Sequence, residues 1–205
     1  MTPGLPPVPV LEGARVRLEP LSVEHVPGLV DAAGSDRSTY GYTRVPGGNR
    51  PEMEEYVCAL LGRRAAGEQI PFAQVGIDEG RAVGSTSFLN LRRVEGDQAL
   101  FAVEIGGTWL GSAAQGTGIN TEAKLLLLTH AFERWGVARV DVKTDARNAR
   151  SRRAIERMGA SFEGVLRCWQ PSGASGEEGR FRDTAMYSVV REEWPGVRAG
   201  LQKRL

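Results

Sequence analysis

A glycine-containing loop leads directly into an apolar helical run between Gln115 and Leu128, with the sequence QGTGINTEAKLLLL. Its two glycines, Gly116 and Gly118, permit positive φ angles and let a ligand approach the backbone closely. The first N–H groups of a helix lack intrahelical partners and lie at the positive end of the helix dipole. The segment therefore suits either a tight turn between a strand and a helix or a cradle for phosphate oxygens.

Two other kinds of phosphate-binding loop fit the chain poorly. A P-loop requires the string GxxxxGK followed by Ser or Thr, and the sequence does not contain it. A dinucleotide-binding fold requires GxGxxG directly after a parallel strand. Here Thr121 occupies the third glycine position, and several residues separate Gly116 from the preceding strand-like segment.

Hydrophobic periodicity and cap residues predict a mixed sheet with helices on both faces, an α+β fold of three layers. Seven strands are expected, at 14–21, 70–78, 81–92, 98–106, 138–145, 160–169 and 182–190. Helices are expected at 22–34, 51–66, 118–135, 148–158 and 192–204.

Composition and charge are those of a globular protein with a sizeable core. The chain has 205 residues, of which 41% are hydrophobic and 25% charged, and its net charge of +1 gives no reason to expect nucleic acid or an anionic membrane as a partner. Residues 1–11 are expected to form an extended arm without signal-peptide features, and residues 12–205 a single domain. Cys58 and Cys168 fit reduced thiols in a cytoplasmic protein and offer no zinc site.

Three motifs in order resemble the GCN5-related N-acetyltransferase (GNAT) superfamily. Residues 115–120 are similar to its Q/R-x-x-G-x-G/A signature, and the sequence VEIG at 103–106, followed by Trp109, is similar to its fourth strand. The N-x-x-S string at 148–151 and the E-x-x-G-x-x-x-E-G string at 156–164 resemble the Rim-type branch. That branch contains the N-terminal acetyltransferases of ribosomal proteins.

The resemblance covers roughly residues 12–190. It implies a GNAT fold in which a mostly antiparallel sheet opens in a V between strands 98–106 and 138–144 and binds acetyl-CoA as cosubstrate, without a metal ion. The glycine loop would hold the pyrophosphate, and Asn120 departs from the signature at a position where Gly or Ala is usual. The residues that the resemblance places at acetyl-CoA are Ile105, Gly106, Gln115, Gly116, Thr117, Gly118, Ile119, Asn120, Asn148 and Ser151.

Acetyl transfer requires a proton to leave the amine and a proton to reach the departing thiolate. Many family members supply the second proton from a tyrosine, but Ile155 stands at that position here. Ser151 shares a helix face with Ile155 and is the candidate donor, unless it only caps the helix. Glu104 is the candidate base, or a binder of a cationic acceptor, or a solvated strand residue. Alternation is expected to place Phe101, Val103 and Ile105 on one face of the strand and Leu100, Ala102 and Glu104 on the other.

The acceptor predicted from these features is a primary amine, either a protein N-terminus or a small molecule. An α-amine, with a pKa of about 7.7–8.0, loses its proton far more easily at pH 7 than a lysine with a pKa of about 10.4, so a site without a strong base favours α-amines. Because the usual tyrosine is absent, a non-catalytic acyl-CoA sensor is the alternative function. A homodimer is compatible with the resemblance.

Overall fold

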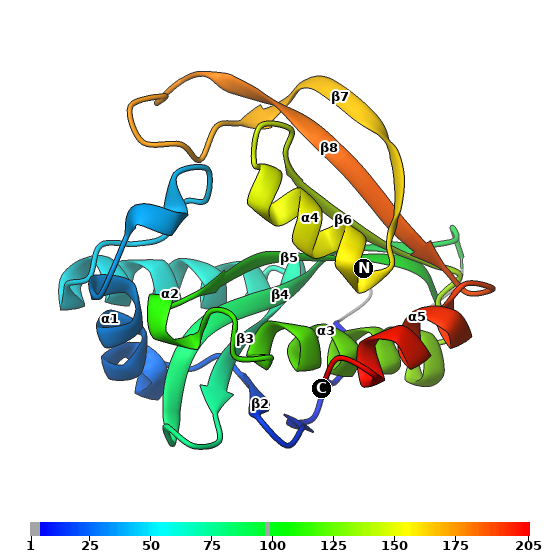
Figure 1. Cartoon of the computed structure of the whole chain (residues 1–205), viewed down its shortest axis with the longest axis horizontal. Helices are drawn as coiled ribbons and strands as arrows, with labels where there is room; N and C mark the ends of the chain where they lie inside the picture. Colours follow the sequence, from blue (N-terminus) through cyan, green and yellow to red (C-terminus); the bar gives the residue numbers. More distant parts are fainter. Residues whose placement is uncertain (1–4, 97–98) are drawn as a thin grey trace.

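The structure, a computed structural model, describes residues 5–96 and 99–205. One sheet of eight strands runs through these residues in the order β1-β2-β3-β4-β5-β6-β8-β7, with helices on both faces (Figure 1). The strands are β1 (Leu11–Glu12), β2 (Val16–Pro20), β3 (Gln69–Gly76), β4 (Arg81–Arg93), β5 (Leu100–Leu110), β6 (Arg139–Asp145), β7 (Ser161–Pro171) and β8 (Phe181–Val190). The α-helices are α1 (Val26–Gly34), α2 (Arg50–Ala65), α3 (Ile119–Thr129), α4 (Ala149–Met158) and α5 (Trp194–Gln202). The predicted fold class is confirmed.

The eighth strand is β1, which the sequence analysis missed because two residues carry no detectable periodicity. Leu11, expected at the end of the extended arm, pairs with Leu18 of β2. The chain reverses between the two strands, where the N–H of Gly13 donates to the carbonyl of Val16 at 3.0 Å. The expectation of seven strands was therefore wrong by this one short edge strand.

Almost every pair of neighbouring strands is antiparallel, and the exception is β5 with β6. These two strands pair in parallel through three positions only, from Ala102 opposite Arg139 to Glu104 opposite Asp141. Beyond this point β5 continues to Leu110 and β6 continues to Asp145, but the two strands no longer pair with each other. The predicted V-shaped opening is thus present.

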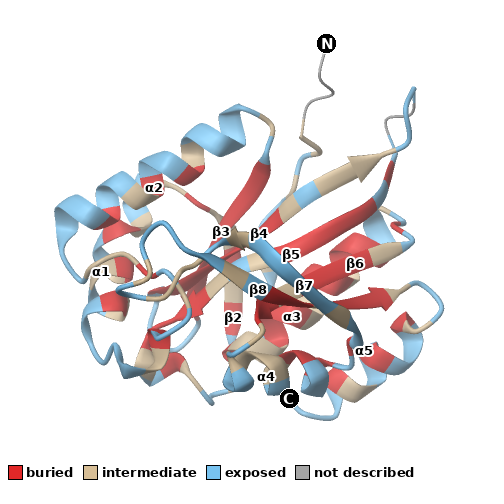
Figure 2. Ribbon diagram, turned by 90° about the horizontal axis from the view of Figure 1, so that it is seen from above, coloured by how far each residue is buried: buried red, intermediate tan, exposed pale blue. Residues whose placement is uncertain are grey.

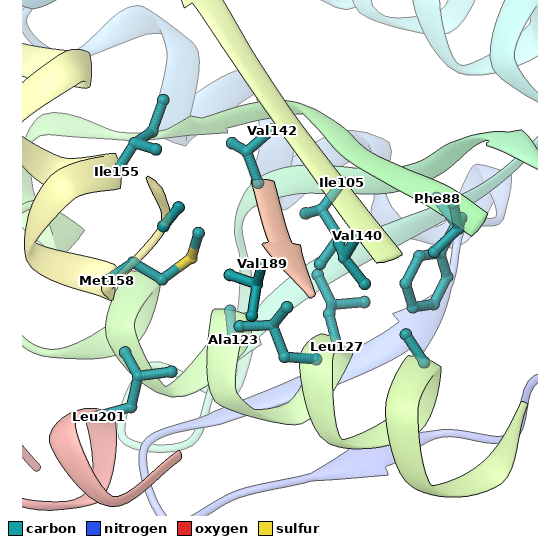
Figure 3. Close-up of a cluster of buried hydrophobic side chains, with 14 of the residues drawn as sticks. Phe88, Ile105, Ala123, Leu127, Val140, Val142, Ile155, Met158, Val189 and Leu201 are labelled. Atoms are coloured by element: carbon teal, nitrogen blue, oxygen red, sulfur yellow. The ribbon is translucent and has the colours of Figure 1, made fainter. Parts of the chain in front are cut away.

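Two hydrophobic clusters hold the helices against the sheet. On one face, α3, α4 and α5 pack on the central strands; in Figure 3, Leu127, Met158 and Leu201 of these helices point towards Val140 and Val189 of β6 and β8. On the other face, α1 and α2 cover mainly β3 and β4. Figure 2 shows the result: β4, β5 and β6 are largely buried, whereas β7 at the sheet edge is largely exposed.

Several element boundaries differ from the sequence-based expectation. The third strand of the meander was expected at 98–106, but β5 runs to Leu110; residue 98 lies outside the described residues. The helix expected to reach Trp135 is α-helical only to Thr129, and a π-helical turn follows from His130 to Arg134. Neither difference alters the order of the elements.

The expected alternation in β5 holds for its middle but not for its start. Val103 and Ile105 are buried in the cluster under α3, as expected. Leu100 lies in that same cluster and Phe101 is exposed, so the faces of these two residues are exchanged relative to the prediction. The pairing of β4 with β5 shifts register on both sides of Arg92, and a register shift moves side chains to the opposite face.

Glu122 in the first turn of α3 fixes the N-terminal strands to this helix. Its buried carboxylate accepts three backbone hydrogen bonds, from the N–H groups of Ala14 at 2.9 Å, Arg15 at 2.7 Å and Val16 at 2.9 Å. The start of α3 is therefore tied to the turn between β1 and β2. Among the described residues, no helix has the length and apolar character needed to cross a membrane.

Replacing Glu122 with alanine is expected to lower the free energy of unfolding by roughly 2–4 kcal/mol, because three buried or half-buried N–H groups lose their acceptor. Urea denaturation measures the change, and Thr121→Ala, a truncation at the neighbouring position, is expected to change stability far less. An effect of Glu122→Ala no larger than that of Thr121→Ala would contradict the anchoring role.

Candidate functional site

The opening between β5 and β6 leaves an unpaired strand edge at Ile105 and Gly106. Both residues pair with β4 on one side, opposite Phe88 and Ser87. On the other side, no residue of β6 pairs with them, because the parallel ladder ends at Glu104. Their backbone groups on this side are therefore available to an extended ligand such as a pantetheine arm.

Just beyond this edge, β5 contains a bulge. Between the pairs Ser87–Gly106 and Ser85–Trp109, two residues of β5 stand opposite one residue of β4. The first of them, Gly107, has a φ of 60°, a conformation that glycine adopts without strain. The bulge bends β5 at the mouth of the opening.

The glycine loop has the geometry expected of an anion cradle. Gly116 and Gly118 have φ angles of 80° and 92°, and a Cβ at Gly116 would project into open space. The first intrahelical bond runs from the N–H of Glu122 to the carbonyl of Gly118 at 3.0 Å. The N–H groups before Glu122 in the first turn therefore have no carbonyl acceptor within the helix, and they lie at the positive end of the dipole of α3.

Asn120 has unused hydrogen-bonding capacity inside this cradle. Its Oδ1 atom is buried, and no described residue donates a hydrogen bond to it. A buried amide oxygen without a partner is costly, and a ligand at the loop would relieve the cost. The open glycine loop, the N–H groups of the first turn and this side chain together fit the pyrophosphate region of acetyl-CoA.

Gln115 has a structural role in addition to its place in the motif. Its Nε2 donates to the carbonyl of Leu110 at 2.8 Å and to Thr39 Oγ1 at 3.0 Å, while its Oε1 accepts from Arg150 at 2.6 Å. Its own N–H donates to the carbonyl of Ser112 at 3.1 Å. Gln115 thus joins the end of β5, the segment before α2 and the start of α4. Thr117 closes the loop, since its hydroxyl donates to the carbonyl of Ala114 at 2.8 Å.

Asn148 and Ser151 lie at the start of α4, on the β6 side of the opening. Asn148 is the N-cap, and its Oδ1 accepts a hydrogen bond from the N–H of Ser151 at 3.0 Å. The capping is therefore done by Asn148, and the Ser151 hydroxyl has no hydrogen-bond partner within the described part of the chain. Ile155, at the usual tyrosine position, is buried in the core.

Glu104 is a buried carboxylate, and within the described part of the chain only one of its two oxygens accepts a hydrogen bond. Its Oε2 accepts hydrogen bonds from Asn90 at 2.7 Å and from Lys143 at 2.9 Å. Its Oε1 points along the strand, and a Cβ on Gly106 would lie 3.0 Å from it. Glu104 is therefore not a solvated strand residue.

Sequence reasoning missed the partners of Glu104. Lys143 comes from β6, and Asn90 has a φ of 47° at the irregular pairing of β4 with β5. Alternation could have placed Lys143 on the face of Asp141 and Asp145, but which strand lies beside β5 depends on the tertiary fold. The positive φ of Asn90 has no clear sequence signal.

Arg147 joins the end of β6 to the β7–β8 loop. It forms ion pairs with Asp145 and Glu177, each at 2.7 Å, and its guanidinium lies over the ring of Tyr42. The hydrogen bonds from Arg147 and Ser172 lower the pKa of Glu177 to about 2. These contacts bring the segment before α2 and the β7–β8 loop together beside the opening, as Figure 1 shows.

Lys124, also missed, is buried beneath the first turns of α3. Its Nζ donates to Thr108 Oγ1 at 2.7 Å, and Thr108 is hydrogen-bonded to Thr86 at 2.8 Å. Burial lowers the pKa of Lys124 from 10.5 to about 7. A lysine within a run of leucines is unusual on the core-facing side of a helix, and this was the sequence signal available for Lys124.

The sequence profile of the acetyltransferase (GNAT) domain matches residues 15–161. A Bacillus subtilis (strain 168) protein provisionally named ribosomal N-acetyltransferase YdaF is 33% identical over 118 residues. That match covers 58% of this chain and 58% of the relative, so the chain spans little more than half the length of this curated relative.

Solved structures share the fold over nearly the whole chain. A GCN5-related N-acetyltransferase from Brucella melitensis has a TM-score of 0.83 and 28% identity, with 97% of this chain and 86% of that chain covered. A protein from T. thermophilus, provisionally named an acetyltransferase, has a TM-score of 0.79 and 36% identity, with 96% of each chain covered.

The depressed pKa of Lys124 predicts a pH dependence of stability. Between the folded pKa of about 7 and the unfolded value of 10.5, the unfolded chain binds more protons, so stability rises with pH across this window. Lys124→Met removes the group, and its stability relative to wild type is expected to fall by up to about 4 kcal/mol from pH 7 to pH 10.

Urea denaturation at several pH values measures this difference. Lys203→Met, at an exposed position near the C-terminus, is the matched control and is expected to follow the wild-type curve. Parallel stability curves for Lys124→Met and wild type would show that Lys124 does not titrate in this window.

Proposed function

Because the chain belongs to the GNAT acetyltransferase family, we propose that it transfers the acetyl group of acetyl-CoA directly to a primary amine. The observation that carries the proposal is the arrangement at the opening of the sheet. The sheet has an unpaired strand edge at Ile105 and Gly106, and a glycine cradle precedes α3. Among the described residues, one carboxylate oxygen of Glu104 and the hydroxyl of Ser151 have no hydrogen-bond partner. We assign residues 12–205 to the catalytic domain.

The cosubstrate is proposed to bind along β5 and α3. Backbone groups of Ile105 and Gly106 would pair with the pantetheine arm, and the first turn of α3 would hold the pyrophosphate. Asn148 would contact the pantetheine arm from the other side of the opening. Acetyl-CoA supplies an activated thioester, and side chains of the protein accept and donate the protons.

Glu104 is proposed to accept the proton of the attacking amine, directly or through water, at its free Oε1. The neutral amine nitrogen then forms a bond to the acetyl carbon, and the carbon–sulfur bond breaks. The departing thiolate takes the proton of the Ser151 hydroxyl. The nitrogen releases its second proton as the amide forms, and this proton returns through solvent to the serine oxygen, while Glu104 gives its proton to solvent. Lys143 and Asn90 hold the other oxygen of Glu104 and so orient the carboxylate.

Direct transfer is favoured over a covalent acyl-enzyme. Cys58 lies on α2 and Cys168 on the edge strand β7, and both are exposed. An acyl-cysteine requires a thiol placed beside a base. Neither cysteine is on β5, β6 or the start of α4, where the proposed catalytic residues lie.

The first acceptor class proposed is the α-amine of a protein N-terminus. An α-amine needs only about 1 kcal/mol to become neutral at pH 7, which suits a base that is itself ion-paired. The name of the Bacillus subtilis relative, a ribosomal N-acetyltransferase, points to the same class.

Replacing Asn120 with aspartate tests the cradle with an isosteric change. A carboxylate there would repel the pyrophosphate, and the acetyl-CoA dissociation constant is expected to rise at least about tenfold, in line with the worth of one charge-assisted contact. Thermal shift reads the binding, since a ligand at one hundred times its Kd adds about 2.7 kcal/mol of stability.

The matched control for this experiment is Asn49→Asp, the same change at the exposed N-cap of α2. It is expected to bind acetyl-CoA like wild type. Wild-type affinity in Asn120→Asp would exclude the proposed position of the pyrophosphate.

The proposed proton transfers are tested with Glu104→Gln and Ser151→Ala. Each is expected to lower kcat by about 10²-fold or more with little change in acetyl-CoA affinity, as is typical of lost general acid–base catalysis. Steady-state kinetics with a free-amine peptide measures both values. If the double variant transfers acetyl groups at the wild-type rate, neither residue has the proposed role.

A further inference from the structure

Arg182 at the start of β8 has a half-buried guanidinium for which no described residue supplies a hydrogen-bond acceptor. Its Nε atom is buried and unbonded, and no described residue accepts a hydrogen bond from the rest of its guanidinium. Burial lowers the pKa of Arg182, and the charges of Asp145 and Glu104 only partly oppose this effect. A guanidinium removed from water without compensating bonds is costly, so its place calls for an acceptor oxygen.

Arg182 projects from the same face of the sheet as the proposed reaction site. In the pairing of β6 with β8, Asp145 stands opposite Thr184 and Lys143 opposite Met186, and Arg182 follows this face at the two-residue period of a strand. Glu104 shares the face through its pairing with Asp141. On this side of the sheet, α1 and α2 lie mainly over β3 and β4 rather than over β6 and β8.

The carboxylates of this face are already paired with other cations. Glu104 pairs with Lys143, and Asp145 pairs with Arg147. Asp141 binds two arginines, Arg92 and Arg139. None of the three lies within ion-pair distance of Arg182, so its donors remain available to a guest molecule.

Two loops border this position. The β7–β8 loop leads directly into Arg182, and its Gly173 lies against the segment before α2, where an added Cβ would stand 3.1 Å from the backbone nitrogen of Arg44. Arg147 and Tyr42 make a second contact between the same segments. An acceptor entering between these loops towards Glu104 would pass beside Arg182.

We propose that Arg182 binds the carbonyl or carboxylate oxygen that an α-amine acceptor carries on the carbon bonded to its amine-bearing Cα, and so selects α-amino acyl compounds over simple alkyl amines. The inference rests on the proposed acetyl transfer and adds the group that recognises the acceptor. A guanidinium offers two parallel N–H donors to a carbonyl or carboxylate oxygen. Acceptors of this class include peptide N-termini, amino acid amides and free amino acids.

The test compares acceptors that differ only in this oxygen-bearing group. Alaninamide and alanine carry it as an amide and as a carboxylate, and isopropylamine lacks it. Serinamide, serine and 2-aminopropan-1-ol form a second set with a polar side chain. Values of kcat/KM for each acceptor are measured with wild type, Arg182→Met and Arg182→Lys. Because the three proteins are compared on the same acceptor, differences in amine pKa between acceptors do not affect the comparison.

Arg182→Met is expected to lower kcat/KM about 10–100-fold for the acceptors with the α-carbonyl oxygen. The same variant should change the value for isopropylamine and 2-aminopropan-1-ol less than about twofold, and Arg182→Lys should recover part of the loss. Arg180→Met, which removes an exposed arginine two residues away, is the control and should behave as wild type. A thermal melt and an acetyl-CoA shift equal to wild type verify the fold of each variant.

The outcomes separate the two proposals. Equal losses for both kinds of acceptor, or no loss for either, would overturn the role of Arg182 and leave acetyl transfer intact. A larger loss for the amides than for the free acids supports the role and identifies the peptide carbonyl as the group bound; the reverse supports it with the carboxylate. If wild type acetylates none of these acceptors, nor a peptide with a free N-terminus, although it binds acetyl-CoA, acetyl transfer and the role of Arg182 both fail.

Discussion

The parallel pairing of β5 with β6 ends after three positions, and the rest of the site depends on this early end. If the ladder continued past Glu104, the backbone of Ile105 and Gly106 would be occupied by β6. Instead the strands separate, and each retains its partner on the outer side, β4 for β5 and β8 for β6. The sheet thereby stays whole while its centre opens, because the hydrophobic cluster under α3 spans both strands.

The opening also explains the distribution of charge around it. Glu104 is buried at the point where the strands part, and its ion pair with Lys143 links β5 to β6 across the gap. Asp145 and Arg147 connect the far end of β6 to the β7–β8 loop. These paired charges fix the geometry of the face, whereas Arg182, which has no acceptor among the described residues, is left to recognise a ligand.

Much of the fold and part of the site were predictable from sequence because their signals are local. The positive φ angles of Gly116 and Gly118 and the N-cap at Asn148 follow from residues within a few positions of each other. Glu104 was found because a glutamate is unusual inside an apolar strand. These features need no knowledge of what lies across the sheet.

The rest depended on contacts between distant segments. Lys143 lies 39 residues from Glu104, and Lys124 lies 16 residues from Thr108, so neither pairing could be read from the sequence. The exchange of faces at Leu100 and Phe101 follows from irregular pairing with β4, which periodicity within one strand cannot reveal. Arg182 was missed because an arginine near a loop is ordinary, and only its burial without a partner distinguishes it.

In the proposed function, the opening between β5 and β6 is where an acetyl group passes to an amine. Mass spectrometry of two peptides of equal length, one with a free α-amine and blocked lysine, the other with a blocked N-terminus and free lysine, tests it most directly in the presence of acetyl-CoA. We expect the mass gain of one acetyl group on the first peptide and little or none on the second. Binding of acetyl-CoA without acetylation of either peptide or of any small amine would contradict it and identify the protein as an acyl-CoA sensor.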